Sequence, residues 1–97
     1  MVKVLVIYDI SDDRHRAKLA EELEMLGLAR IQRSAFIGVV NQYKLKDIEK
    51  AVKIWARGED DIVHIIPLCE NDYRKMKVHG TPWYLKRSRR MRGVLIV

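Results

Sequence analysis

A chain of 97 residues can form one hydrophobic core but not two. Hydrophobic residues make up 48% and charged residues 33% of the chain, which excludes a largely disordered protein. The net charge of +6 is unevenly distributed, because residues 81–97 contain five cations and no acid. We therefore expect one domain overall, nearly neutral over residues 1–80 and continued by a basic C-terminal arm over residues 81–97.

Cysteine content and the length of the apolar runs bear on location. Cys69 is the single cysteine, so no intramolecular disulfide can form, which is typical of a reducing compartment. The longest apolar runs, residues 4–8 and 94–97, are far shorter than a membrane span, and no signal-peptide pattern opens the chain. We expect a cytoplasmic protein that has no membrane partner.

The chain opens with a strand pattern that is followed by a helix pattern. Residues 2–8 are apolar at both parities apart from Lys3, which predicts a central strand covered on both faces. Ser11 is a favourable N-cap, so we expect a helix to begin there. Leucines then recur at helical spacing until Gly27, which supplies the end of the helix.

Residues 28–40 alternate as β structure does, either as one long bent strand or as two short strands that meet near residues 32–34. No Asn-Gly or Gly-Gly turn decides between these two possibilities. Phe36 shares its parity with polar residues of this segment. That parity hints at a polar face, although a ring in the core is the commoner outcome.

The second half of the chain again contains a helix and then a strand. The helix ends near Gly58, and residues 61–69 form the strand, in which Pro67 favours a strand end or an edge. The apolar face of that helix consists of Leu45, Ile48, Val52 and Trp55. Two helices on one face of an antiparallel sheet predict an α+β fold, a ferredoxin-like βαββαβ sandwich. After a helical turn at residues 70–76, the apolar residues 94–97 form a strand in the arm, and a partner subunit would supply the edge it needs.

Asp9 follows the first strand directly, at a place where a side chain emerges from the end of a sheet. The position suits a magnesium ligand, but a polar turn residue is the simpler explanation of one carboxylate. Mg²⁺ usually takes one or two protein carboxylates, so a symmetric dimer that joins two copies of Asp9 would complete the site. Asp12 and Asp13 are better explained as partners of the helix dipole than as ligands.

Five cations gather in two segments that follow Asp9, residues 14–18 and residues 30–33. Guanidinium groups suit phosphate recognition. The five cations are Arg14, Arg16, Lys18, Arg30 and Arg33. A solvated helix face explains most basic helix residues, so these side chains are candidates for binding nucleic acid. The three histidines are widely separated and lack the spacing of metal ligands.

The arm combines aromatic and basic residues. Trp83 and Tyr84 precede its cations and are available for stacking or docking, while the cations suit phosphates. The cations are Lys86, Arg87, Arg89, Arg90 and Arg92. We expect the arm to contact nucleic acid, with a disordered basic tail as the alternative.

A larger pattern extends from the end of the first strand to the middle of the chain. It consists of Tyr8, Asp9, Arg16, Arg30, Ile31, Gln32, Ser34 and Phe36. The order and spacing of these residues resemble the amino-terminal signature of the CRISPR-associated protein 2 family, and residues 65–68 are similar to the last core strand of that family. The resemblance covers residues 2 to about 72.

This resemblance implies a ferredoxin-like homodimer in which Asp9 of each chain lies at the interface and serves a phosphodiesterase that depends on Mg²⁺ (or Mn²⁺). It implies RNA or double-stranded DNA as the substrate and a CRISPR-associated integrase as a partner. The residues that match catalytic positions of the family beside Asp9 are Tyr8, Arg16, Arg30 and Phe36. Lys18 stands where some members have arginine, which keeps the charge and loses the bidentate geometry.

Three functions remain open on the sequence. The first is a metal-dependent endonuclease in CRISPR adaptation, in which Asp9-bound metal activates water. The second is a DNA scaffold without catalysis, which bridges integrase dimers during spacer acquisition and for which Asp9 is dispensable. The third is a ribonuclease of the toxin type, because some toxins resemble this fold and motif.

Overall fold

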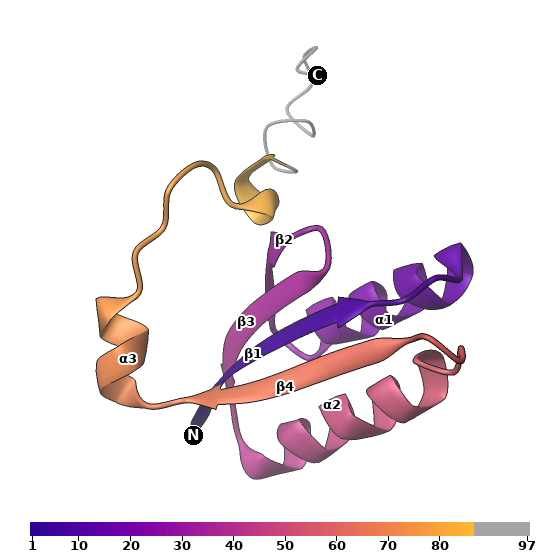
Figure 1. Cartoon of the computed structure of the whole chain (residues 1–97). Helices are drawn as coiled ribbons and strands as arrows, with labels where there is room; N and C mark the ends of the chain where they lie inside the picture. Colours follow the sequence, from indigo (N-terminus) through magenta and orange to yellow (C-terminus); the bar gives the residue numbers. More distant parts are fainter. Residues whose placement is uncertain (87–97) are drawn as a thin grey trace.

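The computed structural model describes residues 1–86. Figure 1 shows its elements, which follow the chain as β1 (Val2–Asp9), α1 (Asp13–Met25), β2 (Ala29–Gln32), β3 (Ala35–Val40), α2 (Gln42–Trp55), β4 (Ile62–Leu68) and α3 (Glu70–Lys75). The strand predicted at residues 94–97 and the cations Arg87, Arg89, Arg90 and Arg92 lie outside the described residues. No helix within residues 1–86 is long and apolar enough to cross a membrane.

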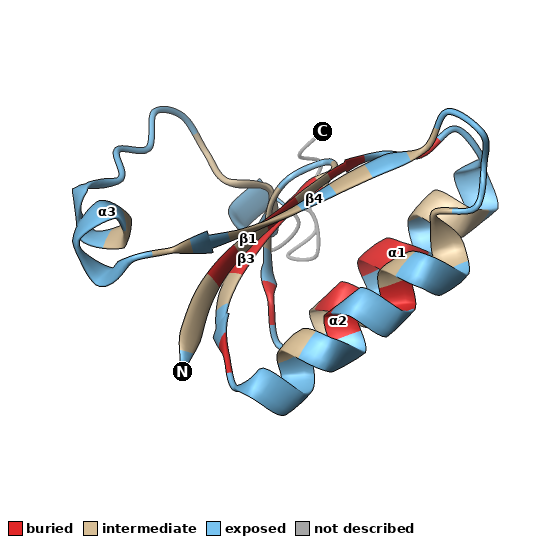
Figure 2. Ribbon diagram, turned by 60° about the horizontal axis from the view of Figure 1, so that its bottom comes forward, coloured by how far each residue is buried: buried red, intermediate tan, exposed pale blue. Residues whose placement is uncertain are grey.

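The four strands form one antiparallel sheet in the order β2-β3-β1-β4. The apolar strand β1 is therefore central, as its sequence predicts, and Pro67 lies on the edge strand β4. Figure 2 shows α1 and α2 on the same side of this sheet. The arrangement is the ferredoxin-like α+β fold that the sequence predicts, because two amphipathic helices bury their apolar stripes together against one sheet face.

Residues 28–40 form two strands rather than one bent strand. Gln32 pairs with Ala35, so the chain reverses at Arg33 and Ser34, and the register shifts between Arg30 and Gln32. The carbonyl oxygen of Ser34 accepts a hydrogen bond from the amide of Tyr8 at 3.1 Å. This contact fastens the turn to the end of the central strand.

The first helix begins one residue later than the sequence predicts. Asp12, not Ser11, is the N-cap, and its side chain accepts hydrogen bonds from the amides of Arg14 and His15, both at 2.9 Å. Ser11 instead uses its hydroxyl in a contact with Asp61. The predicted end at Gly27 is confirmed, because Gly27 has a φ of +93°, in the left-handed region that glycine adopts without a steric penalty.

The core lies between the sheet and the two long helices. Alternate residues of β1 face the helices, and Phe36 of β3 joins them with a fully buried ring. The main members of the core are Val4, Val6, Tyr8, Leu19, Leu23, Phe36, Val40 and Ile48. The hint that Phe36 lies on a polar face is therefore wrong, since Phe36 pairs with Val6 in register and shares its covered face.

The opposite face of the sheet has no layer of long helices within residues 1–86. The residues there pair across strands, with Leu5 of β1 opposite Ile37 of β3 and Ile66 of β4. We call this surface the open face and define it by Leu5, Ile7, Ile37, Val39, Ile66 and Leu68. Residues 76–84 border its β2–β3 side, leaving a groove of about 560 Å³. The sequence predicted that both faces of β1 are covered. In the structure, long helices cover one face alone.

Candidate functional site

Asp9 lies at the end of the open face. It is the last residue of β1, is exposed, and pairs in register with Ile62, the first residue of β4. It shares its parity with Leu5 and Ile7. Within residues 1–86 its carboxylate makes no hydrogen bond or ion pair. The carboxylate is therefore available to a ligand at the rim of an apolar surface.

The chemistry of Asp9 fits a hard divalent cation, because Mg²⁺ prefers carboxylate oxygens and keeps several waters. Residues 1–86 of one chain contain no cluster of three possible metal ligands. Two other carboxylates close to Asp9 in the fold are already used by N–H donors, that of Asp12 by the start of α1 and that of Asp61 by Ser11 and Gly58. Within residues 1–86, Asp9 is thus the carboxylate at the end of β1 that no hydrogen bond or ion pair occupies.

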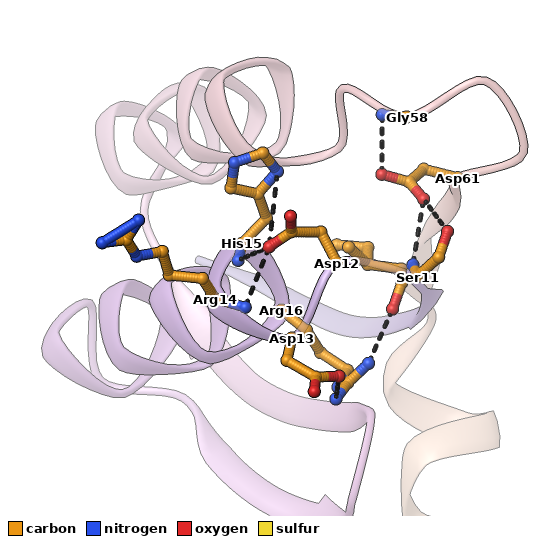
Figure 3. A network of polar contacts seen from close by, with 9 residues as sticks. Ser11, Asp12, Asp13, Arg14, His15, Arg16, Gly58 and Asp61 are labelled. Atoms are coloured by element: carbon orange, nitrogen blue, oxygen red, sulfur yellow. Dashed lines mark hydrogen bonds and ion pairs between the residues drawn. The ribbon is translucent and has the colours of Figure 1, made fainter.

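The segment that follows Asp9 is fixed by Arg16. The Ile10 side chain is buried in the core, and its carbonyl oxygen accepts a hydrogen bond from Nη1 of Arg16 at 2.9 Å. The other terminal nitrogen of Arg16 donates to the Asp13 carboxylate. Figure 3 shows these contacts. Arg16 therefore holds the β1–α1 connection in place and is partly neutralised by Asp13.

A second feature, which we call the arginine cleft, lies between α1 and β2. Its volume is about 750 Å³. Its charged and aromatic lining consists of Arg16, Arg30, Arg33, Trp83, Asp13, Glu21 and Glu24. Asp9 is not among the lining residues. The cleft thus gathers three of the predicted arginines, but it balances them with three acids.

Arg30 occupies the centre of several contacts in this cleft. Its Nε and Nη2 donate to the carbonyl oxygen of Arg33 at 3.0 and 2.7 Å. Its guanidinium carbon lies 4.7 Å from the centroid of the Trp83 ring and 5.7 Å from that of Phe36. Both distances are within the range of cation–π attraction. Trp83, predicted as a stacking or docking residue, therefore docks the first part of the arm on the domain.

Tyr8 lies on the covered face, next to Asp9 in sequence but on the other side of the sheet. Its ring stacks on Phe36 at a centroid distance of 6.2 Å. Its hydroxyl is buried and has no hydrogen-bond partner within residues 1–86. Burial raises the pKa of this hydroxyl above its usual 10.0, although Arg30 and Arg16 oppose the rise. Tyr8 is therefore neutral near pH 7 and contributes to packing.

The remaining predicted cations lie on the surface. Arg14 and Lys18 are exposed on α1, and Lys18 forms an ion pair with Glu21 at 3.9 Å. Arg33 and Lys86 are also exposed. Such solvated cations can contact phosphates without a rearrangement of the fold.

The structure divides the predicted catalytic residues between two places. Tyr8, Arg30 and Phe36 cluster under or beside the arginine cleft, while Asp9 lies at the end of the open face. No sequence pattern indicated Asp61, which contacts Ser11, in the loop after Asp9, from 50 positions away. No local spacing could have revealed that contact, because it depends on the pairing of β1 with β4.

Comparison with protein families and comparison with individual proteins point to the same family. The family described as CRISPR associated protein Cas2 matches residues 1–76. A relative from Korarchaeum cryptofilum, named CRISPR-associated endoribonuclease Cas2, is 42% identical over 79 residues, which cover 81% of this chain and 82% of that protein.

Solved structures share the fold. A hypothetical protein from Thermus thermophilus, TT1823, superposes with a TM-score of 0.71 at 28% identity, covering 84% of this chain and 93% of the other. A chain of a partial Cas6-RT-Cas1–Cas2 complex superposes with a TM-score of 0.61 at 25% identity, covering 86% of this chain and 97% of the other.

Proposed function

Because this chain belongs to the family of CRISPR-associated Cas2 proteins, we propose that it acts as a homodimeric endonuclease in CRISPR adaptation. The substrate is RNA or double-stranded DNA, and the cofactor is Mg²⁺ or Mn²⁺ held by Asp9. The similar protein from Korarchaeum cryptofilum is named an endoribonuclease, which supports phosphodiester cleavage as the reaction class.

The observation that carries the proposal is the placement of Asp9. Its carboxylate is exposed, has no partner within residues 1–86 and lies at the rim of the open face. A two-fold axis that passes close to the Asp9 end of that face would bring the Asp9 carboxylates of two chains toward one another. Two carboxylates are a sufficient protein contribution to a magnesium site.

The open face supplies the reason to dimerise. The face of β1 that α1 and α2 leave uncovered holds two large apolar residues, Leu5 and Ile7, between Lys3 and Asp9. Leu5, Ile37 and Ile66 form a continuous row across three strands of the open face, in which Ile37 is already buried and Leu5 and Ile66 are partly exposed. Apolar surface of this kind gains free energy at about 25 cal/mol per Å² when a partner removes it from water. An isologous contact places the same row on both sides of the interface.

The chain's own residues would divide the work of cleavage. Asp9 would hold the cation, and a divalent cation in such a site supplies an activated water and neutralises charge on the phosphoryl oxygens. Arg16 keeps the β1–α1 connection fixed, and exposed cations such as Arg14 and Arg33 would bind the flanking phosphates. The neutral Tyr8 and the buried Phe36 support Arg30 from beneath.

The test compares Asp9→Asn with Asp47→Asn, which changes an exposed carboxylate on α2. Asp9→Asn keeps the shape of the side chain and removes the charge that holds the cation. We expect its cleavage rate on RNA or duplex DNA to fall at least about 100-fold, the magnitude usual for loss of one electrostatic group in an active site. Asp47→Asn should cleave at the wild-type rate. Equal rates for Asp9→Asn and wild type would refute the proposal.

A scaffold without catalysis is the second candidate. It is favoured by one observation, the similarity of this chain to a component of a partial Cas6-RT-Cas1–Cas2 complex. In this role the dimer bridges two integrase dimers and its cations hold spacer DNA, so Asp9→Asn would leave spacer integration intact. An integration assay with purified integrase separates this role from the nuclease.

A further inference from the structure

We propose that Asp61 is a positioning residue for Asp9. It fixes the loop after β1 and thereby sets the direction of the Asp9 carboxylate. The inference rests on the proposed function, because it concerns the carboxylate that would hold the cation. Nothing in the composition of the chain or in the signature around Asp9 points to Asp61; contacts between two loops assign it this role.

The Asp61 carboxylate uses both of its oxygens. Oδ1 accepts hydrogen bonds from the amide and from the hydroxyl of Ser11, each at 3.1 Å. Oδ2 accepts a hydrogen bond from the amide of Gly58 at 2.8 Å. Figure 3 shows Asp61 between Ser11 and Gly58. One side chain therefore joins the β1–α1 loop to the α2–β4 loop.

These loops lie at the end of the sheet where β1 ends and β4 begins (Figure 1). Asp9 pairs with Ile62, the neighbour of Asp61. The next residue, Ile10, is fixed by its buried side chain and by the bond from Arg16, and Ser11 is fixed by Asp61. Every residue from Asp9 to Ser11 is thus held by a different contact, and Asp61 provides the last of them.

The close contact between the Asp61 carboxylate and residue 58 depends on glycine at position 58, which has no side chain. A Cβ atom at this position would lie 2.9 Å from Cγ and both carboxylate oxygens of Asp61. A methyl group there would push the carboxylate away while leaving its charge intact. Gly58→Ala therefore tests the position of Asp61 separately from its charge.

Asp61 is not itself a good cation ligand. Its oxygens face three N–H and O–H donors, and these bonds lower the pKa of Asp61 below its usual 3.8. A metal would have to displace them. Partners that orient a metal ligand from outside its coordination sphere typically change metal affinity by about 10- to 100-fold when they are removed. Asp61 acts on the site as such an orienting partner and not as a ligand.

The experiment measures Mn²⁺ affinity of the full chain by the loss of the free-ion electron paramagnetic resonance signal, together with the thermal midpoint. Asp61→Asn should raise the Mn²⁺ dissociation constant about tenfold, because an amide accepts on one side only and its NH₂ group would face a donor. Gly58→Ala should raise it in the same direction. The matched control is Asp60→Asn, which neutralises the adjacent exposed carboxylate and should bind Mn²⁺ as wild type does.

Three results have distinct meanings. A tenfold rise in Asp61→Asn and Gly58→Ala, with Asp60→Asn unchanged, supports the positioning role. A lower thermal midpoint with an unchanged dissociation constant overturns it and makes Asp61 a purely structural residue. If both variants fail to fold, Ser11→Ala decides, because it removes one bond and should raise the constant about twofold, and an unchanged constant then refutes the role.

A variant of Asp9 separates this inference from the proposed function. Asp9→Asn should abolish Mn²⁺ binding at this site, whatever Asp61 does. Wild-type affinity in Asp9→Asn would overturn the metal site itself, and the positioning role with it. Loss of binding in Asp9→Asn combined with wild-type affinity in Asp61→Asn would overturn the positioning role alone.

Discussion

The two faces of the sheet differ although the same strands form both. Tyr8 and Asp9 are adjacent in β1, yet Tyr8 is buried beneath the helices while Asp9 is exposed at the end of the open face. The covered face is completed by this chain alone, through α1 and α2. Along β1 the open face holds Leu5 and Ile7 between Lys3 and Asp9, and it has no layer of long helices within residues 1–86. The main core of the chain therefore lies on one face, and the proposed assembly and chemistry belong to the other.

The largest expected effect comes from a change in the covered face. Phe36→Ala removes a fully buried ring from the core and leaves a cavity, so we expect the free energy of unfolding to fall by about 3–5 kcal/mol. Val39→Ala, on the open face of the same strand, should cost less than about 1 kcal/mol, because Val39 is 43% exposed. Denaturant unfolding of the two variants measures the difference. Similar losses would show that the two faces contribute equally to the fold.

The next effect separates assembly from folding with two adjacent residues of β4. Ile66 faces the open side, whereas Ile65 packs against the core. Ile66→Lys should raise the dimer dissociation constant at least about tenfold, equivalent to ~1.4 kcal/mol, with the monomer still folded. Ile65→Lys should instead lower the thermal midpoint, since it places a charge among apolar side chains.

Light scattering and thermal unfolding distinguish these two outcomes. A wild-type chain that is monomeric at micromolar concentration would remove the basis of the Ile66 prediction, and with it the proposed dimer. A dimer that survives Ile66→Lys would place the interface away from the open face.

The smallest effect concerns the hydroxyl of Tyr8. Because burial raises the pKa of Tyr8, the folded state holds its proton more tightly than the unfolded state does. That stability is fully present below the unfolded pKa of about 10 and is lost as the pH rises through the folded pKa. Tyr8→Phe should therefore weaken the alkaline loss of stability.

At pH 7 Tyr8→Phe should cost nothing and could stabilise the fold by up to about 1 kcal/mol, because the buried hydroxyl has no partner within residues 1–86. Tyr43→Phe is the control, since Tyr43 is 80% exposed. Unfolding free energies from pH 7 to 11 test both statements. A clear loss of stability at pH 7 would mean that the Tyr8 hydroxyl makes a contact beyond those of residues 1–86.

The sequence by itself determined the alternation of strands and helices and the apolar stripes of both helices, but it left open whether residues 28–40 form one strand or two. Residues 2–8 predicted the central strand because their apolar content at both parities is a local property of the chain. The end of the first helix at Gly27 was predictable for the same reason, and so was the exposed position of Asp9 at the end of its strand. Periodicity of this kind depends on neighbours in the sequence, and it does not change with the way in which the helices and strands pack.

Only the tertiary structure decided which parity of each strand meets the helices. The polar neighbours of Phe36 suggested one face, and the pairing of Phe36 with Val6 placed it on the other. The N-cap moved from Ser11 to Asp12 because Asp61, distant in sequence, takes the Ser11 hydroxyl. Contacts between remote segments have no signature in local spacing, since they form only once β1 and β4 are paired and bring their loops to the same end of the sheet.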